Sequence, residues 1–500
     1  MRVHYYLCFV CFGITTAYCA DNDTNSVRKL SLSDCVQMAI EHNLDVQIDR
    51  LNPEIARYNI QMAYAGYEPV ITMGGQHDYS LSPGGYDPKL GIRYQGSTRD
   101  ANSFSTGVEG MLPTGFTYKM SGSIYDEYGI RPASVPPKYD NSRGSASITM
   151  SQPLLKNFWI DDVRMRIMVN KKSLKGSELG LRLRMMSTIS SVEQAYYDLT
   201  YALENVKVQE KALELANRLL AENKKRVEVG SMAPLDEKQA ESRVAANKSS
   251  LLIARQNLII QQNVLKKLIN SDFSSWHEAL LEPSEPLKAI AQVPNLQDCW
   301  QKGTTLRPDL LQSKNELEKQ DIVLRYNKNQ LFPELDLVGS FGYAGAGAEF
   351  THTFGGIQEL DSPYYSYGAT LRMPLSNRAA RNNYKIGKSQ KQQLLLQHKK
   401  LEQDVLVQID DAVKRVQTAY QRVDATKQAR LYAEAALDAE QKKLENGKST
   451  SFIVLQLQSD LTTARSEEIG ALADYNKSIT QLELAEGSIL DKHQIKIDIK

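Results

Sequence analysis

The apolar residues of this chain recur with two different periods along the sequence. In two long segments they return every three or four positions, which is the period of an amphipathic helix. In several short segments they alternate with polar residues, which is the period of a half-buried strand. In the first long segment the helical period is carried by Ala212, Leu215, Ala216, Leu219 and Leu220.

Both long segments lack proline, which is absent between Pro153 and Pro234 and after Pro374. Both are rich in Ala, Leu, Glu, Lys and Gln, which are strong helix formers. The pattern predicts a helix of roughly 70 residues in each segment, about 105 Å long at 1.5 Å per residue. A soluble coiled-coil rod would have the same helical pattern, but such a rod would not explain the alternating segments.

Each long helix is followed by a glycine and a second helical pattern. Gly230 and Gly447 stand where a helix C-terminus often requires a positive φ angle. The helical patterns at 235–270 and 452–487 then predict antiparallel partners for the long helices.

The alternating segments predict β-strands with one apolar face. Period-two segments of about ten residues are typical of transmembrane strands, although a half-buried soluble sheet would look similar. A further hairpin is predicted at 104–124, where two alternating runs flank a Pro/Gly turn at 112–115. The other segments lie at 71–79, 145–152, 335–343 and 367–373.

The landmarks of the first half return in the second half. Asp34, Cys35, Gln37 and Asp45 match Asp298, Cys299, Gln301 and Asp309 at a constant offset, and Pro69 matches Pro333. Pro153 pairs with Pro374, Gly230 with Gly447, and Gln239 with Gln456. Because these landmarks are collinear, the sequence predicts two internal repeats, at 21–290 and 291–500.

Residues 1–20 have the pattern of a secretory signal peptide. Arg2 precedes an uncharged apolar run, and Ala17 and Ala20 close it. Lipidation of Cys19 is the alternative interpretation. Two cysteines then remain, Cys35 and Cys299, which are too few for a disulfide scaffold. We expect both to be free, because equivalent positions of two repeats lie too far apart for a bridge.

Composition narrows the classes of function. The formal net charge is +1, so nothing points to nucleic acid as a partner. The 25 tyrosines suit a membrane interface. The seven histidines are scattered, without metal-ligand spacing, and no nucleophile elbow is present. Gly345 and Gly347 resemble half a phosphate loop, but we expect a flexible loop there. The sequence therefore predicts neither an enzyme nor a cofactor or metal site.

The duplicated order resembles that of the TolC-like outer membrane efflux proteins. The resemblance is carried by Pro153 with Leu154, by Pro374 with Leu375, and by the hairpin tips RVEVGSMAPLDEKQAES and KLENGKSTSFIVLQLQS. It implies a mixed fold, all-α plus a transmembrane β-barrel. In this fold a long antiparallel α-helical tunnel in the periplasm continues a β-barrel shared by a homotrimer in the cell outer membrane.

The resemblance also implies function and partners. The chain would be the outer-membrane exit duct of a tripartite efflux or type I secretion system, in contact with outer membrane lipid. It would receive substrates from an inner-membrane transporter through a periplasmic adaptor (membrane fusion) protein. The alternative is a periplasmic coiled-coil adaptor or structural protein, which would normally carry one helical hairpin rather than two. The cargo, whether drug, metal or protein, stays open.

Members of this family close the tunnel near the second hairpin tip. The resemblance puts the periplasmic gate at Leu444, Ser449, Ile453 and Gln456, with Asp236 as the acid of the first hairpin. Because the usual aspartate positions hold Ile453 and Gln456, we expect an apolar or amide constriction. Ordinary helix packing is the alternative role for both residues.

The adaptor of such systems docks on the hairpin tips. The matching positions here are Val229, Gly230 and Ser231 in the first tip and Asn446, Gly447 and Lys448 in the second.

The hairpin at 104–124 exceeds the four strands that a subunit of this family usually contributes. A trimeric twelve-strand barrel must match the tunnel below it. We therefore expect this hairpin to stand beyond the strand ends rather than to widen the barrel.

Overall fold

The computed structural model of the chain describes four stretches, 27–89, 91–132, 136–291 and 294–495. The expected signal peptide, with Cys19, lies outside the described residues. None of the described helices has an apolar stretch long enough, and free enough of charge, to cross a membrane.

The chain folds into two compact units, and each long helix runs through both. Of the described residues, the hairpin unit, which holds the helical tips, contains 27–44, 188–291 and 415–481. The sheet unit contains 45–89, 91–132, 136–187, 294–414 and 482–495.

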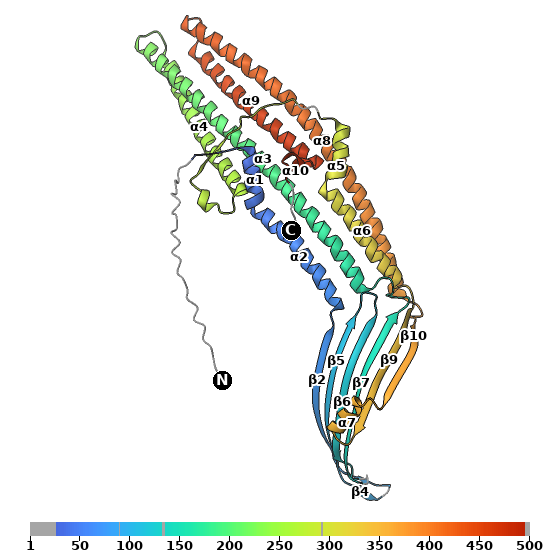
Figure 1. The fold of residues 1–500 in the computed structure, drawn as a ribbon. Helices are drawn as coiled ribbons and strands as arrows, with labels where there is room; N and C mark the ends of the chain where they lie inside the picture. The colour runs from blue at the N-terminus through green and yellow to red at the C-terminus, as the bar shows by residue number, and fades with distance from the viewer. Residues whose placement is uncertain (1–26, 90, 133–135, 292–293, 496–500) are drawn as a thin grey trace, which may run out of the picture. The chain divides into compact units, whose positions relative to one another are not determined.

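The sheet unit contains a six-stranded antiparallel sheet (Figure 1). Each neighbouring pair of strands is antiparallel, so β10 and β2 are its two edges. The small hairpin of β3 (Gly85–Asp87) and β4 (Ile92–Tyr94) lies between β2 and β5 in the sequence. In spatial order the strands are β10 (Pro363–Arg372), β9 (Glu334–Gly347), β7 (Lys138–Pro153), β6 (Thr117–Ile130), β5 (Ser97–Met111) and β2 (Val70–Ser82).

The expectation that 104–124 stands beyond the strand ends is wrong. These residues belong to β5 and β6, which lie inside the sheet between β2 and β7. The pairing of β6 with β7 runs from Thr117↔Ser151 to Ile130↔Lys138. The hairpin enters the sheet because its alternation matches that of its neighbours, so every ladder hydrogen bond and the apolar face continue through it.

The register gives the sheet one apolar and one polar face. On the polar face hydroxyl groups pair across strands, as in Ser121–Ser147 (3.2 Å between Oγ atoms) and Ser340–Ser366 (2.8 Å). The apolar face carries Ile71, Met73, Phe104, Val108, Met120, Ile124, Ala146, Ile148, Met150, Leu335, Leu337, Phe341, Tyr343, Tyr365, Tyr367, Ala369 and Leu371.

A short helix, α7 (Phe350–Gln358), follows β9 and packs on the apolar face. Its Phe350 lies edge-on to Phe104, with ring centroids 6.0 Å apart. The expectation of a flexible loop at Gly345 and Gly347 is wrong, since both lie in β9 under this helix. A Cβ atom at Gly345 would clash with the carbonyl oxygen of Thr353, so the close approach of α7 needs glycine here.

The sheet unit also contains helices, among them α2 (Leu44–Tyr64), α6 (Pro308–Asn329) and the parts of α3 (Asp162–Glu228) and α8 (Arg378–Glu445) next to the strands. In repeat two, α6 lies between α3 and α8. Lys172 of α3 pairs with Glu318 at 2.5 Å, and Lys391 of α8 pairs with Asp321 at 2.6 Å. In repeat one, α2 packs on α3 through the pair Arg184–Asp49, 2.6 Å apart.

The hairpin unit contains two antiparallel helical hairpins, α3 with α4 (Pro234–Ile269) and α8 with α9 (Ser451–Glu486). The long helices have 67 and 68 residues, as the sequence predicted. Gly230 and Gly447 have φ angles of +73° and +69°, which confirms the predicted glycine turns. Each turn closes with two backbone hydrogen bonds that satisfy the last carbonyls of the long helix.

The repeats are also visible in the short helices. α1 (Leu32–His42) and α5 (Leu296–Leu306) both have 11 residues and begin at the offset that the landmarks gave. They carry Cys35 and Cys299, both free and buried. Burial raises the pKa of both thiols to about 12. The remaining elements are the parallel pair β1 (Val27–Leu30) and β8 (Leu280–Pro283), and α10 (Ile489–Lys492).

Candidate functional site

The two helical tips are exposed loops of similar construction. In the first tip Val229 is 77% exposed, and the next residue, Gly230, is exposed too. In the second tip Gly447 is exposed. The polar tip residues cap their own helices, since Ser231 Oγ donates to the carbonyl of Arg226 (3.0 Å) and Asn446 Nδ2 donates to that of Lys442 (2.7 Å). The side chains of Ser231 and Asn446 are thus bonded to their own helices, and the glycine next to each has no side chain.

Close to the tips, two polar contacts join the first hairpin to the second. Asn223 of α3 donates from Nδ2 to Oγ of Ser451, the first residue of α9, over 2.6 Å. Both residues are 1% exposed. Arg226 donates from Nη1 to the carbonyl oxygen of Leu444 in α8 over 3.4 Å. These contacts join the two hairpins close to their tips.

Farther from the tips, α9 contacts the first hairpin mostly through polar side chains. Ser466 bonds to Asn205 of α3 over 2.9 Å, and Arg243 of α4 donates to Ser459 over 3.3 Å. Beyond them Thr480 donates to the buried carboxylate of Glu193. A cavity of about 590 Å³ lies between the hairpins. This part of the interface therefore contains unfilled space, unlike a close-packed interior.

An ion pair also joins the two hairpins, through Lys477 of α9. Its Nζ lies 2.8 Å from Asp198 of α3 and 3.1 Å from Asp474. Burial alone would lower the pKa of Lys477, but the two carboxylates outweigh it and raise the pKa above its usual value. The lysine therefore stays charged and keeps the hairpins linked at neutral pH.

One apolar cluster lies under the tips, where α3, α8 and α9 meet. Leu444, one of the expected gate residues, is 6% exposed and belongs to it. In a single chain its side chain thus packs between the helices of the hairpin unit. The cluster consists of Leu219, Leu437, Leu444, Val454, Leu455 and Leu461.

Two other expected gate residues lie on the opposite, exposed face of α9. Ile453 is 42% exposed, and Gln456 is exposed one turn later and donates to Asp460 over 3.0 Å. Ser449 precedes α9 and donates to Glu440 over 2.5 Å. Lys443 and Ser449 together lower the pKa of the Glu440 carboxyl.

Asp236 lies at the start of α4, near Asn223. Its carbonyl oxygen accepts a 3.4 Å hydrogen bond from Asn223 Nδ2. Within the stretches that the structure describes, its carboxylate has neither a hydrogen-bond nor an ion-pair partner. The backbone of Asp236 thus lies beside the contact between Asn223 and Ser451.

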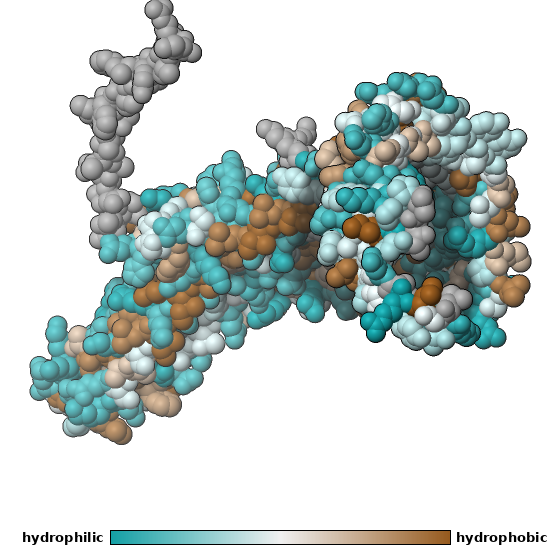
Figure 2. Space-filling model, turned by 90° about the horizontal axis from the view of Figure 1, so that it is seen from below, coloured by the Kyte–Doolittle hydropathy of each residue, from teal (hydrophilic) through white to brown (hydrophobic). Residues whose placement is uncertain are grey.

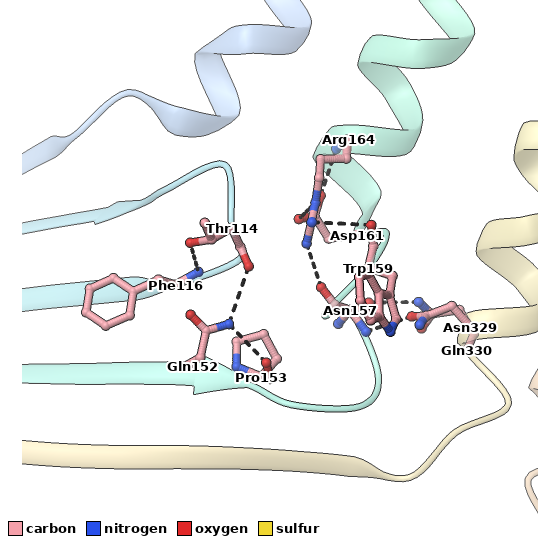
Figure 3. Close-up of polar contacts among 10 residues, drawn as sticks. All are labelled: Thr114, Phe116, Gln152, Pro153, Asn157, Trp159, Asp161, Arg164, Asn329 and Gln330. Carbon is pink, nitrogen blue, oxygen red and sulfur yellow. Dashed lines mark hydrogen bonds and ion pairs between the residues drawn. The ribbon is translucent and has the colours of Figure 1, made fainter.

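The sheet unit has a polar junction of its own, where β7 passes into α3 (Figure 3). Asp161 accepts from the backbone N–H of Arg164 and pairs with its Nε, both at 2.7 Å. The Arg164 guanidinium also donates to the carbonyl of Asn157 over 2.8 Å. Asn157 has a φ of 65° and accepts through its side chain from Gln330 over 2.8 Å. The junction thus fixes the strand end to both α3 and α6.

The comparisons with known proteins agree on one family. A profile of the outer membrane efflux proteins matches residues 135–271 and 303–488, which is more than half of the chain. The chain belongs to the outer membrane efflux protein family. It is thus an outer-membrane exit duct, and the two matched segments fall in the two repeats.

Individual relatives are distant in sequence. Outer membrane efflux protein BepC of Brucella suis biovar 1 is 21% identical over 347 residues, which make up 68% of this chain and 72% of BepC. The Campylobacter jejuni CmeC outer membrane channel shares the fold, with 16% identity and a TM-score of 0.67 over 91% of this chain and 85% of CmeC. The open-state Neisseria gonorrhoeae MtrE channel has 15% identity and a TM-score of 0.65 over 92% of this chain and 89% of MtrE.

Reasoning from the sequence missed the inter-hairpin contacts of this efflux protein. Asn223 and Ser451 are far apart in the chain, and neither was among the expected docking or gate residues, although Ser451 lies in the second tip segment. The sequence did offer one signal. Asn223 follows Leu219 by one helical turn, so it is a polar residue on an otherwise apolar face of the helix. The structure brings Asn223, Asp236 and Ser451 together, while Ile453 and Gln456 point away from this contact on an exposed face.

Proposed function

We propose that the efflux protein works as a homotrimer in a tripartite efflux or type I secretion system and passes substrates from an inner-membrane transporter to the cell exterior. The observation that supports the assembly is an uncovered apolar stripe on α2. Several apolar patches are exposed on the surface in Figure 2. The α2 stripe consists of Ile48, Leu51, Ile55, Tyr58 and Met62, which are between 54% and 69% exposed.

The second repeat indicates what should cover this stripe. The matching positions on α6 are buried or half-buried, because α6 lies between α8 and α3. At one of them, Asn315 is 3% exposed and donates to the carbonyl of Lys172 in α3 over 2.7 Å. In repeat one, among the described residues, α2 packs on α3 and its apolar stripe stays exposed. A second copy, placed head to tail, would bring its α8 to the free side of α2 and complete the same arrangement.

The sheet supports contact with outer membrane lipid. The apolar face of β9 runs from Leu335 to Tyr343, eight steps or about 27 Å, close to the band of about 25 Å on outer-membrane strands. Trp159 is 79% exposed beside the strand ends, where aromatic residues often mark a membrane interface. The polar face would then line the duct.

We place the repeat boundary near residue 290, so that residues 21–290 and 291–500 each supply one hairpin. The tips then offer two similar docking sites for a periplasmic adaptor protein, at 229–231 and 446–448. Their exposure and their bare glycines support this assignment, because a partner can approach the backbone closely there.

We place the gate on the exposed face of α9, at Ile453 and Gln456. Three copies around an axis would form an apolar ring and an amide ring, and an apolar ring can block ions by excluding water. Leu444 and Ser449 support this face from within the hairpin unit, and Asp236 lies at the contact between the hairpins. The gate would open when the adaptor draws the second hairpin away from the first.

The trimer is tested by a charge placed on the α2 stripe. An Ile55→Glu substitution should abolish the trimer, because it would bury an unpaired carboxylate in each of the three contacts. Light scattering coupled to size-exclusion chromatography of detergent-solubilised protein gives the mass. Gln61→Glu adds the same charge at an exposed position of α2 outside the stripe and should leave the trimer intact. A trimeric Ile55→Glu protein would contradict the proposed interface.

The gate is tested by conductance in planar bilayers. The wild type should conduct little, and Ile453→Ser with Gln456→Ser should conduct more, because it removes the apolar ring. Ile453→Asp should instead introduce block by multivalent cations, since three carboxylates would face one another. If neither substitution changes conductance or block, these residues serve only in packing and the gate lies elsewhere.

A further inference from the structure

We propose that the β5–β6 hairpin forms part of the membrane wall and that three copies close one sheet, with β2 of each copy paired to β10 of the next. Six strands in each of three copies make a wall of 18 strands. This inference rests on the proposed homotrimer and adds the partner of each sheet edge and the size of the wall.

The strand directions allow this closure. Six strands alternate in direction, so β2 and β10, at the two edges, run in opposite directions. A head-to-tail neighbour therefore brings β10 antiparallel to β2. In the described sheet, each edge has a row of backbone N–H and C=O groups without a strand partner. Within a membrane, these groups must form hydrogen bonds inside the protein.

The edge side chains match such a neighbour. Met73 of β2 is 82% exposed and Tyr367 of β10 is 85% exposed, and both lie on the apolar face. The neighbouring strands β5 and β9 continue this face, on which α7 packs over part of β6, β7 and β9. A second copy would therefore extend one apolar surface rather than bring apolar and polar faces together.

The hairpin carries both faces of the wall. Its Phe104, Val108, Met120 and Ile124 continue the apolar face between the residues of β2 and β7. Its Ser121 lies on the polar face and pairs with Ser147 of β7. A hairpin standing outside the membrane would have no need of a lipid-matched face.

The hairpin is also anchored at its turn. Gly115, in the turn between β5 and β6, has a φ of +82° and packs against the β7–α3 junction. A Cβ atom there would lie 3.2 Å from Arg164 Nη2 and 3.3 Å from the carbonyl oxygen of Asn157. Gln152 Nε2 donates to the carbonyl of Thr114 over 3.3 Å in the same turn (Figure 3). The hairpin thus ends at the level of the other strands.

The closure has a consequence for the duct. With strands about 4.8 Å apart and tilted by about 40°, 18 strands give a backbone radius of about 18 Å, against about 12 Å for twelve strands. Barrels of 16–18 strands keep an aqueous channel. The polar face would line this channel with small residues such as Ser121 and Ser147 and with charged residues such as Arg143.

The test compares adjacent residues on opposite faces of β6. Single Met120→Cys and Ser121→Cys substitutions are made in a Cys35→Ser, Cys299→Ser background, and Ile148→Cys and Ser147→Cys on β7 serve as references. Each thiol is labelled with bimane, and the trimers are reconstituted in vesicles with brominated phospholipid. We expect strong quenching at positions 120 and 148, and at least fivefold weaker quenching at 121 and 147.

The outcomes separate this inference from the proposed trimer. If the protein is trimeric and position 148 is quenched but position 120 is not, the hairpin lies outside the wall and the inference is overturned. If the purified wild-type protein is not a trimer, the proposed function fails instead. A cryo-EM map of the wild-type trimer in nanodiscs gives an independent count, in which 18 strands support the inference and 12 overturn it.

Discussion

An Asn223→Ala channel is expected to open far more often than the wild type. The substitution removes the buried 2.6 Å hydrogen bond to Ser451 and leaves that hydroxyl without its partner. An unsatisfied buried group costs about 1–3 kcal/mol. Because the contact joins the two hairpins, this cost falls on the closed state and should raise the open population about 5- to 150-fold. Single-channel recording in planar bilayers measures the open probability.

The matched control for this prediction is Asn247→Ala. Asn247 of α4 donates to the carbonyl of Ala212 in α3 over 3.1 Å, so this bond lies within the first hairpin. Its loss should destabilise that hairpin without changing the open probability. Ser451→Ala and the double variant complete a cycle, in which the second substitution should add little to the first. Equal effects of the Asn223 and Asn247 substitutions would show that the inter-hairpin contact does not hold the gate.

The helices and strands could be predicted from the sequence because each follows from a local pattern. The long helices, the glycine turns at Gly230 and Gly447 and the alternating strands lie where the sequence indicated. The duplicated order was also visible, since α1 and α5 begin at the offset of Cys35 and Cys299. The profile of the outer membrane efflux proteins confirms the family that this order suggested.

Contacts between segments that are distant in the chain could be predicted less well. The place of 104–124 was misjudged because the family's usual strand number was preferred to the hairpin's own alternation, which already matched its neighbours. Leu444 aligns with a gate position, yet its helix phase turns it into the cluster of Leu437 and Leu455. The expected gate at Ile453 and Gln456 stays a prediction, because it depends on three chains meeting at one axis.

An Arg164→Ala variant is expected to lose much of the stability of the sheet unit. Asp161, which caps the start of α3, has a side chain only 8% exposed and pairs with Arg164. Removing the guanidinium leaves this carboxylate buried and unpaired, which costs about 3–5 kcal/mol. The loop carbonyls of Asn157 and Trp159 lose their donor as well. At roughly 2 °C per kcal/mol for a unit of this size, the apparent melting temperature should fall by about 6–10 °C.

Arg166→Ala is the control for this loss. The pair of Arg166 and Asp162 is also an arginine–aspartate pair at the start of α3, but it is exposed to water. Arg166 lies 2.8 Å from Asp162, but their side chains are 67% and 46% exposed. Water solvates such a pair, so its removal should cost at most about 1 kcal/mol. Circular dichroism of both variants, heated at one scan rate in the same detergent, provides the comparison. If the two substitutions lower the melting temperature equally, the junction does not depend on the buried pair. The charge of Arg164 would then stabilise the protein no more than that of a surface arginine does.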